Sequence, residues 1–361
     1  SEASHFRVRH VESELNLFDL LGWTSSSLGD WIVRGVNIHF DAGDNDRNLE
    51  RIVQNLLDNV PIAGASVGGR IRIQDVVADA TDMATGGEWR LTRGKAEIRL
   101  KPDSIGATFS GTVTDNAGQS GSIRAIVSAH NSEEHHAARS ATSPTPTHRW
   151  KCELRNQSVP ISLISLIRGA FADGNSLVPP RIGGEATGMI RLSGDSDGAI
   201  TAVADGLEVD SVEVADTTNS NRIWTNQHAS IEGQLTLNGT QVIGRELQIK
   251  TDLGMATMDG AFSHSSLWIT RQTRPLRWLK PIDGEITAEI DLVAMAERLP
   301  DVASLRDGTR IVSGKITAKM ESLPIDQANA FRLSLECDAL RTRAKLRVAE
   351  VEPMGFSAIV A

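Results

Sequence analysis

Apolar and polar residues alternate with a period of two in many short stretches of this chain, which is the pattern of a strand with one dry face and one wet face. In residues 95–101, KAEIRLK, the apolar positions are Ala96, Ile98 and Leu100. The stretch 285–292, EITAEIDL, alternates in the same way. Parallel sheets covered on both sides show continuous apolar runs instead, so the pattern predicts a mainly β fold with an antiparallel sheet that has one face in water.

Helical periodicity is confined to three short segments. Residues 48–60 carry an apolar stripe and stop before Pro61, and residues 292–299 repeat the pattern before Pro300. The third segment, 160–171 (PISLISLIRGAF), is apolar almost all round. It is too short to span a bilayer, so it predicts a plug buried inside a sheet or a helix lying in an interface.

The length of 361 residues favours two domains, or one elongated sheet that grows by adding strands. Residues 130–148 (HNSEEHHAARSATSPTPTH) contain no apolar residue larger than alanine and carry two prolines. Such a segment cannot contribute to a packed core, so it predicts a polar linker or long loop. The sequence therefore predicts a β-rich segment with short helices at 1–129 and a β-sheet region at 149–361.

Charge and composition narrow the choice of partners. Acidic residues outnumber basic ones by 46 to 37, for a formal charge of −9, and no stretch concentrates Lys and Arg. Aromatic residues make up 4% of the chain and tyrosine is absent, so surfaces on which bases could stack are scarce. Nucleic acid is therefore not expected as a partner.

The ends and the cysteines say little about the compartment. The chain begins at Ser1 without a basic n-region or a long apolar h-region, so we expect a piece of a longer protein. No apolar run is long enough to form a transmembrane helix. Cys152 and Cys337 allow one disulfide at most and lack metal-type spacing, which leaves the redox environment open.

Only one sequence pattern suggests a nucleophile. Residues 64–68, Gly-Ala-Ser-Val-Gly, match the G-x-S-x-G motif, which exposes serine on a turn from a strand into a helix. Here a helical pattern precedes the motif and a strand pattern follows it. The reversed order favours a simple loop over a catalytic Ser66, and no other catalytic motif is present, so we expect a protein that is not an enzyme.

Two clusters could hold metal ions, but each has a simpler interpretation. The residues His130, Glu133, Glu134, His135 and His136 lie in the predicted linker, where rigid support is missing, so a solvated segment is favoured. The acidic set Asp41, Asp44, Asp46 and Glu50 misses EF-hand spacing, so capping of the helix at 48–60 is favoured over calcium. We therefore predict no metal and no cofactor.

Residues 159–262 carry a recognisable order of motifs. The helical stretch VPISLISLIRGAF is followed by a strand that ends in Leu192-Ser193-Gly194, and a later strand closes with Gly260-Ala261-Phe262. This order resembles the AsmA/TamB-like proteins of diderm bacterial envelopes. The tail from Gly284, with EIDLVAMAERLP, is similar to the same family's strand, short amphipathic helix and Leu-Pro pattern.

The resemblance implies a long twisted sheet folded lengthwise into a groove, described for this family as β-taco-like. Its apolar inner face would shield phospholipid or other acyl chains in outer-membrane lipid transport or assembly. The implied location is the periplasm, with an inner-membrane anchor in a segment missing from this chain and partners in the inner and outer membranes. The alternating pattern is consistent with this function, because lipid tails can cover an apolar sheet face, and each buried methylene then contributes roughly 0.8 kcal/mol of stabilisation.

The candidate residues lining this groove are apolar positions of the alternating strands, namely Ile190, Leu192, Ile286, Ile290, Ile316, Met320, Leu333, Leu335 and Leu346. In the alternative, the same residues close into the core of a structural or adhesive β-sandwich without ligand. The third interpretation is a hydrolase that uses Ser66.

Overall fold

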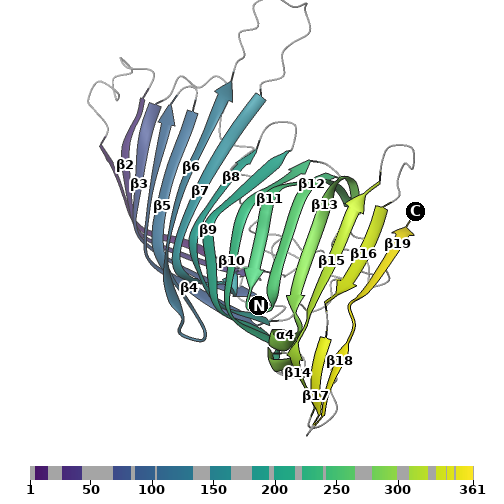
Figure 1. Ribbon diagram of the computed structural model, residues 1–361. Helices are drawn as coiled ribbons and strands as arrows, with labels where there is room; N and C mark the ends of the chain where they lie inside the picture. Colours follow the sequence, from purple (N-terminus) through teal and green to yellow (C-terminus); the bar gives the residue numbers. More distant parts are fainter. Residues whose placement is uncertain are drawn as a thin grey trace, which may run out of the picture. The chain divides into compact units, whose positions relative to one another are not determined.

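The protein is described from a computed structural model, which covers residues 5–14, 27–42, 68–82, 86–101, 104–132, 147–163, 181–194, 199–215, 222–238, 241–264, 279–298, 309–323, 331–338, 340–344 and 347–360. These residues form β-strands almost throughout, with one short helix (Figure 1). Sixteen strands belong to one sheet and three to a small second sheet. The predicted mainly β fold with an antiparallel sheet is confirmed, whereas a lipid-filled groove stays a prediction.

The chain divides into two compact units, Ser1–Ile200 and Thr201–Ala361, which we call unit 1 and unit 2. This division differs from the linker predicted at 130–148. The described ends of that segment lie in two neighbouring strands, which pair as far as Ser132 and Thr147. Residues 133–146 lie outside the described structure.

In unit 1 the strands are neighbours in chain order. They are β1 (His5–Glu14), β2 (Ser27–Ala42), β3 (Gly68–Asp82), β4 (Gly87–Lys101), β5 (Ser104–Asp115), β6 (Ser120–Ser132), β7 (Thr147–Pro160) and β8 (Arg181–Gly194). Strands β2 and β3 pair in parallel, which the alternating pattern did not predict. Parallel neighbours need a long crossover connection, and residues 43–67 are long enough to provide one. The helix predicted at 48–60 falls in this connection, outside the described residues.

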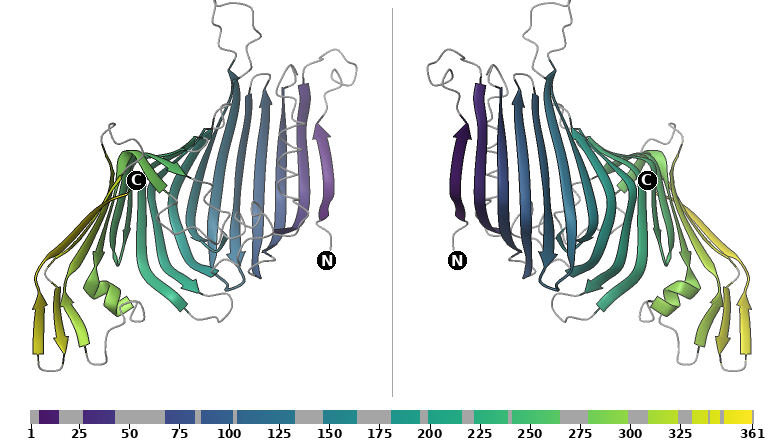
Figure 2. Two further views of the ribbon diagram at one scale, coloured as in Figure 1. Left: turned by 90° about the vertical axis from the view of Figure 1, so that its right-hand side faces the viewer. Right: turned by 90° about the vertical axis from the view of Figure 1, so that its left-hand side faces the viewer.

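Unit 2 contains the remaining strands and the helix. Its large sheet has the order β9 (Ile200–Ala215), β10 (Arg222–Asn238), β11 (Gln241–Thr251), β12 (Gly254–His264), β13 (Leu279–Asp291), β15 (Lys315–Ser322), β16 (Phe331–Cys337) and β19 (Met354–Val360). The small sheet has the order β14 (Thr309–Ser313), β17 (Leu340–Ala344) and β18 (Arg347–Val351). Figure 2 shows the strands of both units from two further sides.

The helix predicted at 292–299 is confirmed as α4 (Leu292–Arg298), next to β14 in Figure 1. Asp291 caps it, because its Oδ1 accepts hydrogen bonds from the backbone N–H groups of Val293 at 2.8 Å and Ala294 at 3.1 Å. Leu292 is the buried residue of the helix. The predicted third helix, 160–171, is described only as far as residue 163.

The first residues of that third segment lie against the core of unit 1. Leu163 packs on the cluster formed by Ala80, Trp89 and Val113. The Trp89 Nε1–H donates to Ser162 Oγ at 3.0 Å, and this hydroxyl lies 3.3 Å from Asp115 Oδ2, to which it donates. The start of the predicted plug segment is therefore fixed to one end of the sheet by both packing and hydrogen bonds.

Candidate functional site

The register of unit 2 gathers apolar side chains on one face of its sheet. Residues directly opposite each other in antiparallel strands point to the same side. Met258 opposes Ile286, which opposes Met320, and Met320 opposes Leu333, which opposes Ala358. One apolar row therefore crosses the five strands β12, β13, β15, β16 and β19.

Two more rows run beside the first, each two residues further along the strands. The next row is Ala256, Ala288, Ala318, Leu335 and Phe356, and the third is Gly254, Ile290, Ile316, Cys337 and Met354. We call these three rows the apolar face of unit 2. They explain the period-two pattern of the sequence, because each strand contributes every second residue to this face.

The opposite face of the same strands is polar and laced with ion pairs. Lys315 Nζ lies 2.6 Å from Glu289 Oε2, and Lys319 Nζ lies 3.0 Å from Glu285 and 2.8 Å from Glu321. The hydrogen bond from Lys319, aided by one from Arg332, holds the pKa of Glu321 below its usual value despite some desolvation. Such exposed pairs contribute little stability, but they show which face the side chains give to water.

The apolar face is open to water on β16 and β19, at one edge of the sheet. The exposed fraction is 44% for Leu335, 60% for Met354 and 62% for Phe356, and the residues of β12, β13 and β15 on this face are partly buried. A contiguous apolar surface that protein does not cover marks a binding site more often than a scattered exposed side chain does. This openness favours the predicted lipid-binding face over the alternative of a closed core.

Most of the predicted lining residues come together on this face. Ile286, Ile290, Ile316, Met320, Leu333 and Leu335 all belong to its rows. Ile190 and Leu192 lie in unit 1, on β8, opposite Leu154 and Cys152. Leu346 lies outside the described residues.

Unit 1 has an apolar face built on the same principle. The row through Leu192 continues across β7 to β3 as Cys152, Val127, Ala107, Ile98 and Ile71. Burial raises the pKa of the Cys152 thiol, which keeps it protonated at neutral pH. Cys152 and Cys337 are both free, so no disulfide connects them.

Sequence reasoning missed the residues of β12 and β19 on the apolar face of unit 2. Met354 and Phe356 are among its most exposed members, and Met258 is central to its first row. The signal was present, because residues 354–360, MGFSAIV, place Met, Phe, Ala and Val at alternate positions. Both segments were expected to be strands, but their apolar residues were not among the candidate lining residues.

The remaining candidate residues gain no support. Ser66, Asp44, Asp46, Glu50, Glu133, Glu134, His135 and His136 lie outside the described structure, whereas His130 belongs to β6 and Asp41 to β2. The described residues contain no group of three or more side chains arranged to hold a metal ion. Within the same residues, no helix has the length and apolar character that crossing a bilayer requires.

Comparison with known proteins adds no family assignment. No protein-family model matches the chain, and no curated protein matches it significantly. The resemblance to AsmA/TamB-like proteins therefore stays a prediction, and any function must be argued from the two-faced sheet itself.

Proposed function

We propose that this protein binds acyl chains of lipids on the apolar face of unit 2 and shields them from water, without catalysing a reaction. The observation that carries this proposal is an apolar surface formed by five neighbouring strands, which is exposed at Leu335, Met354 and Phe356 and partly buried on β12, β13 and β15. Contact with hydrocarbon stabilises such a surface, since each fully buried methylene contributes roughly 0.8 kcal/mol.

The size pattern on the face suits a hydrocarbon chain. Ala256, Ala288 and Ala318 form a line of small side chains that crosses three strands. Larger residues flank this line on both sides, such as Met320 in one neighbouring row and Ile316 in the other. Rows two residues apart are separated by about 6.7 Å, so the larger residues stand about 13 Å apart. An acyl chain lying across the strands would fit over the alanines.

The resemblance to AsmA/TamB-like envelope proteins supports the same function. On this basis we propose a periplasmic protein that carries phospholipid or another acyl-chain lipid between the inner and outer membranes, with partners in both. The lipid-binding face itself is argued from the register and exposure alone.

The test compares lipid uptake by two matched double variants. Leu335→Asp with Phe356→Asp places charges on the apolar face at positions that are 44% and 62% exposed. The control, Val312→Asp with Ile359→Asp, alters equally apolar residues with exposed fractions of 48% and 60% that lie off this face. Uptake of a fluorescent fatty acid is measured, together with mass spectrometry of co-purified phospholipid.

We expect the face variant to bind the fatty acid about tenfold more weakly, a loss of about 1.4 kcal/mol. The control should bind like the unchanged protein. A folded, monomeric, lipid-free protein that takes up no fatty acid would refute the proposal. Equal losses in both variants would also refute it, because the effect would then come from charge or solubility rather than from the face.

A further inference from the structure

The polar face of unit 1 is basic, although the protein as a whole is acidic. Lys95 opposes Ser110, which opposes Arg124, and Arg124 opposes Arg155. Antiparallel partners share a face, so strands β4 to β7 present these cations on one side. No local stretch of sequence shows this concentration, because each strand contributes only a few basic residues.

The full set follows from the same register. On strands β3 to β8 this face carries the basic residues Arg70, Arg72, Arg90, Lys95, Arg99, Lys101, Arg124, Lys151, Arg155 and Arg191, against the carboxylates Asp79, Glu88, Glu97, Glu153 and Glu185. We call this set the basic face of unit 1. Its surplus of positive charge contrasts with the formal charge of −9 for the chain.

Two of these carboxylates, Glu97 and Glu153, are already neutralised by arginines, and Asp79 Oδ1 lies 3.6 Å from Arg90 Nε. Glu97 Oε1 accepts hydrogen bonds from Arg99 at 2.6 Å and from Arg70 at 2.8 Å, and these bonds hold the pKa of Glu97 below its usual value. Glu153 Oε1 accepts one from Arg155 at 2.7 Å. The cations Lys95, Lys101, Arg124 and Lys151 have no ion-pair partner among the described residues.

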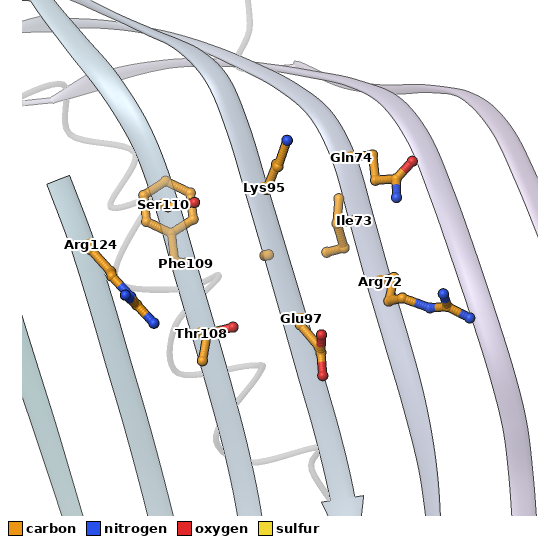
Figure 3. A pocket seen from close by; sticks show the side chains of 10 residues that line it. Arg72, Ile73, Gln74, Lys95, Glu97, Thr108, Phe109, Ser110 and Arg124 are labelled. Atoms are coloured by element: carbon orange, nitrogen blue, oxygen red, sulfur yellow. The ribbon is translucent and has the colours of Figure 1, made fainter. Parts of the chain in front are cut away.

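A hollow of about 370 Å³ opens on this face where two strands bulge (Figure 3). Its walls include Lys95, Ser110 and Arg124, which come from β4, β5 and β6. A β-bulge between Thr92 and Lys95 of β4 shifts the pairing of this strand with β5. Arg72 also lines the hollow, and its buried Nε has no hydrogen-bond partner in the described structure. Ile73, Phe109 and the carboxylate of Glu97 line the hollow as well, and Glu97 is bonded to Arg99 and Arg70. The remaining cations, hydroxyls and unused N–H suit a phosphate group.

We propose that the basic face of unit 1 docks on the surface of an anionic lipid bilayer. Six adjacent strands spaced about 4.8 Å apart make this face about 24 Å wide, too broad to enter the major groove of a duplex. Phe109 is the one phenyl ring among the residues that line the hollow, whereas proteins that bind single strands stack successive bases on several aromatic side chains. Lipid phosphates fit its charge, and this docking does not depend on acyl binding by unit 2.

The first measurement is flotation of the whole protein with vesicles. Vesicles of phosphatidylcholine containing about a third phosphatidylglycerol are compared with vesicles of phosphatidylcholine alone, at low and at high salt. We expect binding to the anionic vesicles only, weakening as salt screens the charges over about 10 Å. No binding to anionic vesicles at low salt, or equal binding to both kinds, would overturn the proposal.

Matched triple variants then separate the face from net charge. Lys95→Gln, Arg124→Gln and Lys151→Gln remove three charges from the basic face. Arg245→Gln, Lys250→Gln and Arg310→Gln remove three exposed charges from unit 2, and none of these has an ion-pair partner among the described residues. Each cation near the membrane contributes about fivefold to binding, so the first triple should weaken it about a hundredfold and the second should leave it within about twofold.

Three results would contradict docking on lipid. Equal losses in both triples would mean that net charge alone drives binding. If a short DNA duplex bound more tightly than the anionic vesicles and displaced the protein from them, the face would be assigned to nucleic acid. Unchanged vesicle binding by the first triple, with its fold verified by circular dichroism, would remove the face from the interaction. Each of these results leaves the fatty-acid experiment on unit 2 unaffected, so the two proposals can fail separately.

Discussion

At the scale of single residues, the position of a residue along its strand decides whether its side chain lies on the apolar or the polar face of the sheet. Ile286 and Thr287 are neighbours in sequence but belong to opposite faces of β13, since Ile286 opposes Met320 and Thr287 opposes Lys319. Moving any strand by one residue would exchange its two faces, so burial of one face fixes the register. A single substitution can therefore test one face without disturbing the other.

The pair formed by His228 and Asp210 predicts a measurable titration. His228 Nδ1 lies 2.8 Å from Asp210 Oδ1, and this hydrogen bond is the main reason why the pKa of His228 lies above its usual value. Because the folded-state pKa is raised, the pair stabilises the fold fully below the unfolded-state pKa, and this contribution is lost as pH rises through the folded-state pKa. NMR titration of His228 should give a lower pKa after Asp210→Asn. An unchanged titration midpoint would contradict the assignment.

Two glycines of unit 1 should respond differently to an added methyl group. A Cβ at Gly121 would collide with the backbone carbonyl of Ser158, whereas a Cβ at Gly106 would meet nothing within 4 Å. We expect Gly121→Ala to lower the free energy of unfolding by about 1–3 kcal/mol, as overpacking does, and Gly106→Ala to change it by less than about 1 kcal/mol. Urea unfolding measures both, and equal effects would contradict the close approach at Gly121.

At the scale of elements, the short helix α4 depends on its cap. Seven residues cannot form a stable helix by propensity alone, so the bonds to Asp291 Oδ1 and the burial of Leu292 must hold it. Asp291→Ala should lower the free energy of unfolding by about 1 kcal/mol. Asp291→Asn keeps the acceptor oxygen, so it should lower the free energy of unfolding by only a few tenths of a kcal/mol. Similar losses in both variants would show that the carboxylate charge, rather than the cap, is needed.

Sequence reasoning could predict the strands and one helix because their signals are local. Alternation identified β13 and β16, and apolar spacing followed by proline identified α4. The parallel pairing of β2 with β3 could not be predicted, because the alternating pattern of a strand does not tell the direction of its neighbour. The bulge between Ile73 and Val76 could not be predicted either, because bulges arise from the match between two strands.

The candidate sites show the same limit. Ile286 and Ile316 could be assigned to an apolar face, because each lies in an alternating strand. That Ile286 lies opposite Met320, and Ile316 opposite Cys337, could be learned only from the register of the paired strands. The basic face of unit 1 was invisible for this reason, since Lys95 and Arg124 are 29 residues apart in the sequence and are brought to one face through Ser110.

At the scale of the whole molecule, nearly every strand pairs with its neighbour in the chain, so stability should be graded within a unit. Strands β5 and β6 are bonded on both sides, whereas β1 pairs only with β2 among the described strands. Native-state hydrogen exchange should therefore be slowest in β5 and β6 and fastest in β1. Uniform protection across unit 1 would show that it opens only as a whole.

The pairing of sequence neighbours also has a consequence for how such a chain can vary. A hairpin such as β11 and β12 enters the sheet as a complete module, and its alternate residues join the existing faces. Duplicating or deleting one hairpin changes the width of the sheet by two strands, or about 10 Å. The apolar and the polar face stay on their own sides of the sheet. The width of the sheet and the chemistry of its two faces can therefore evolve separately. Related chains should differ in length by whole hairpins.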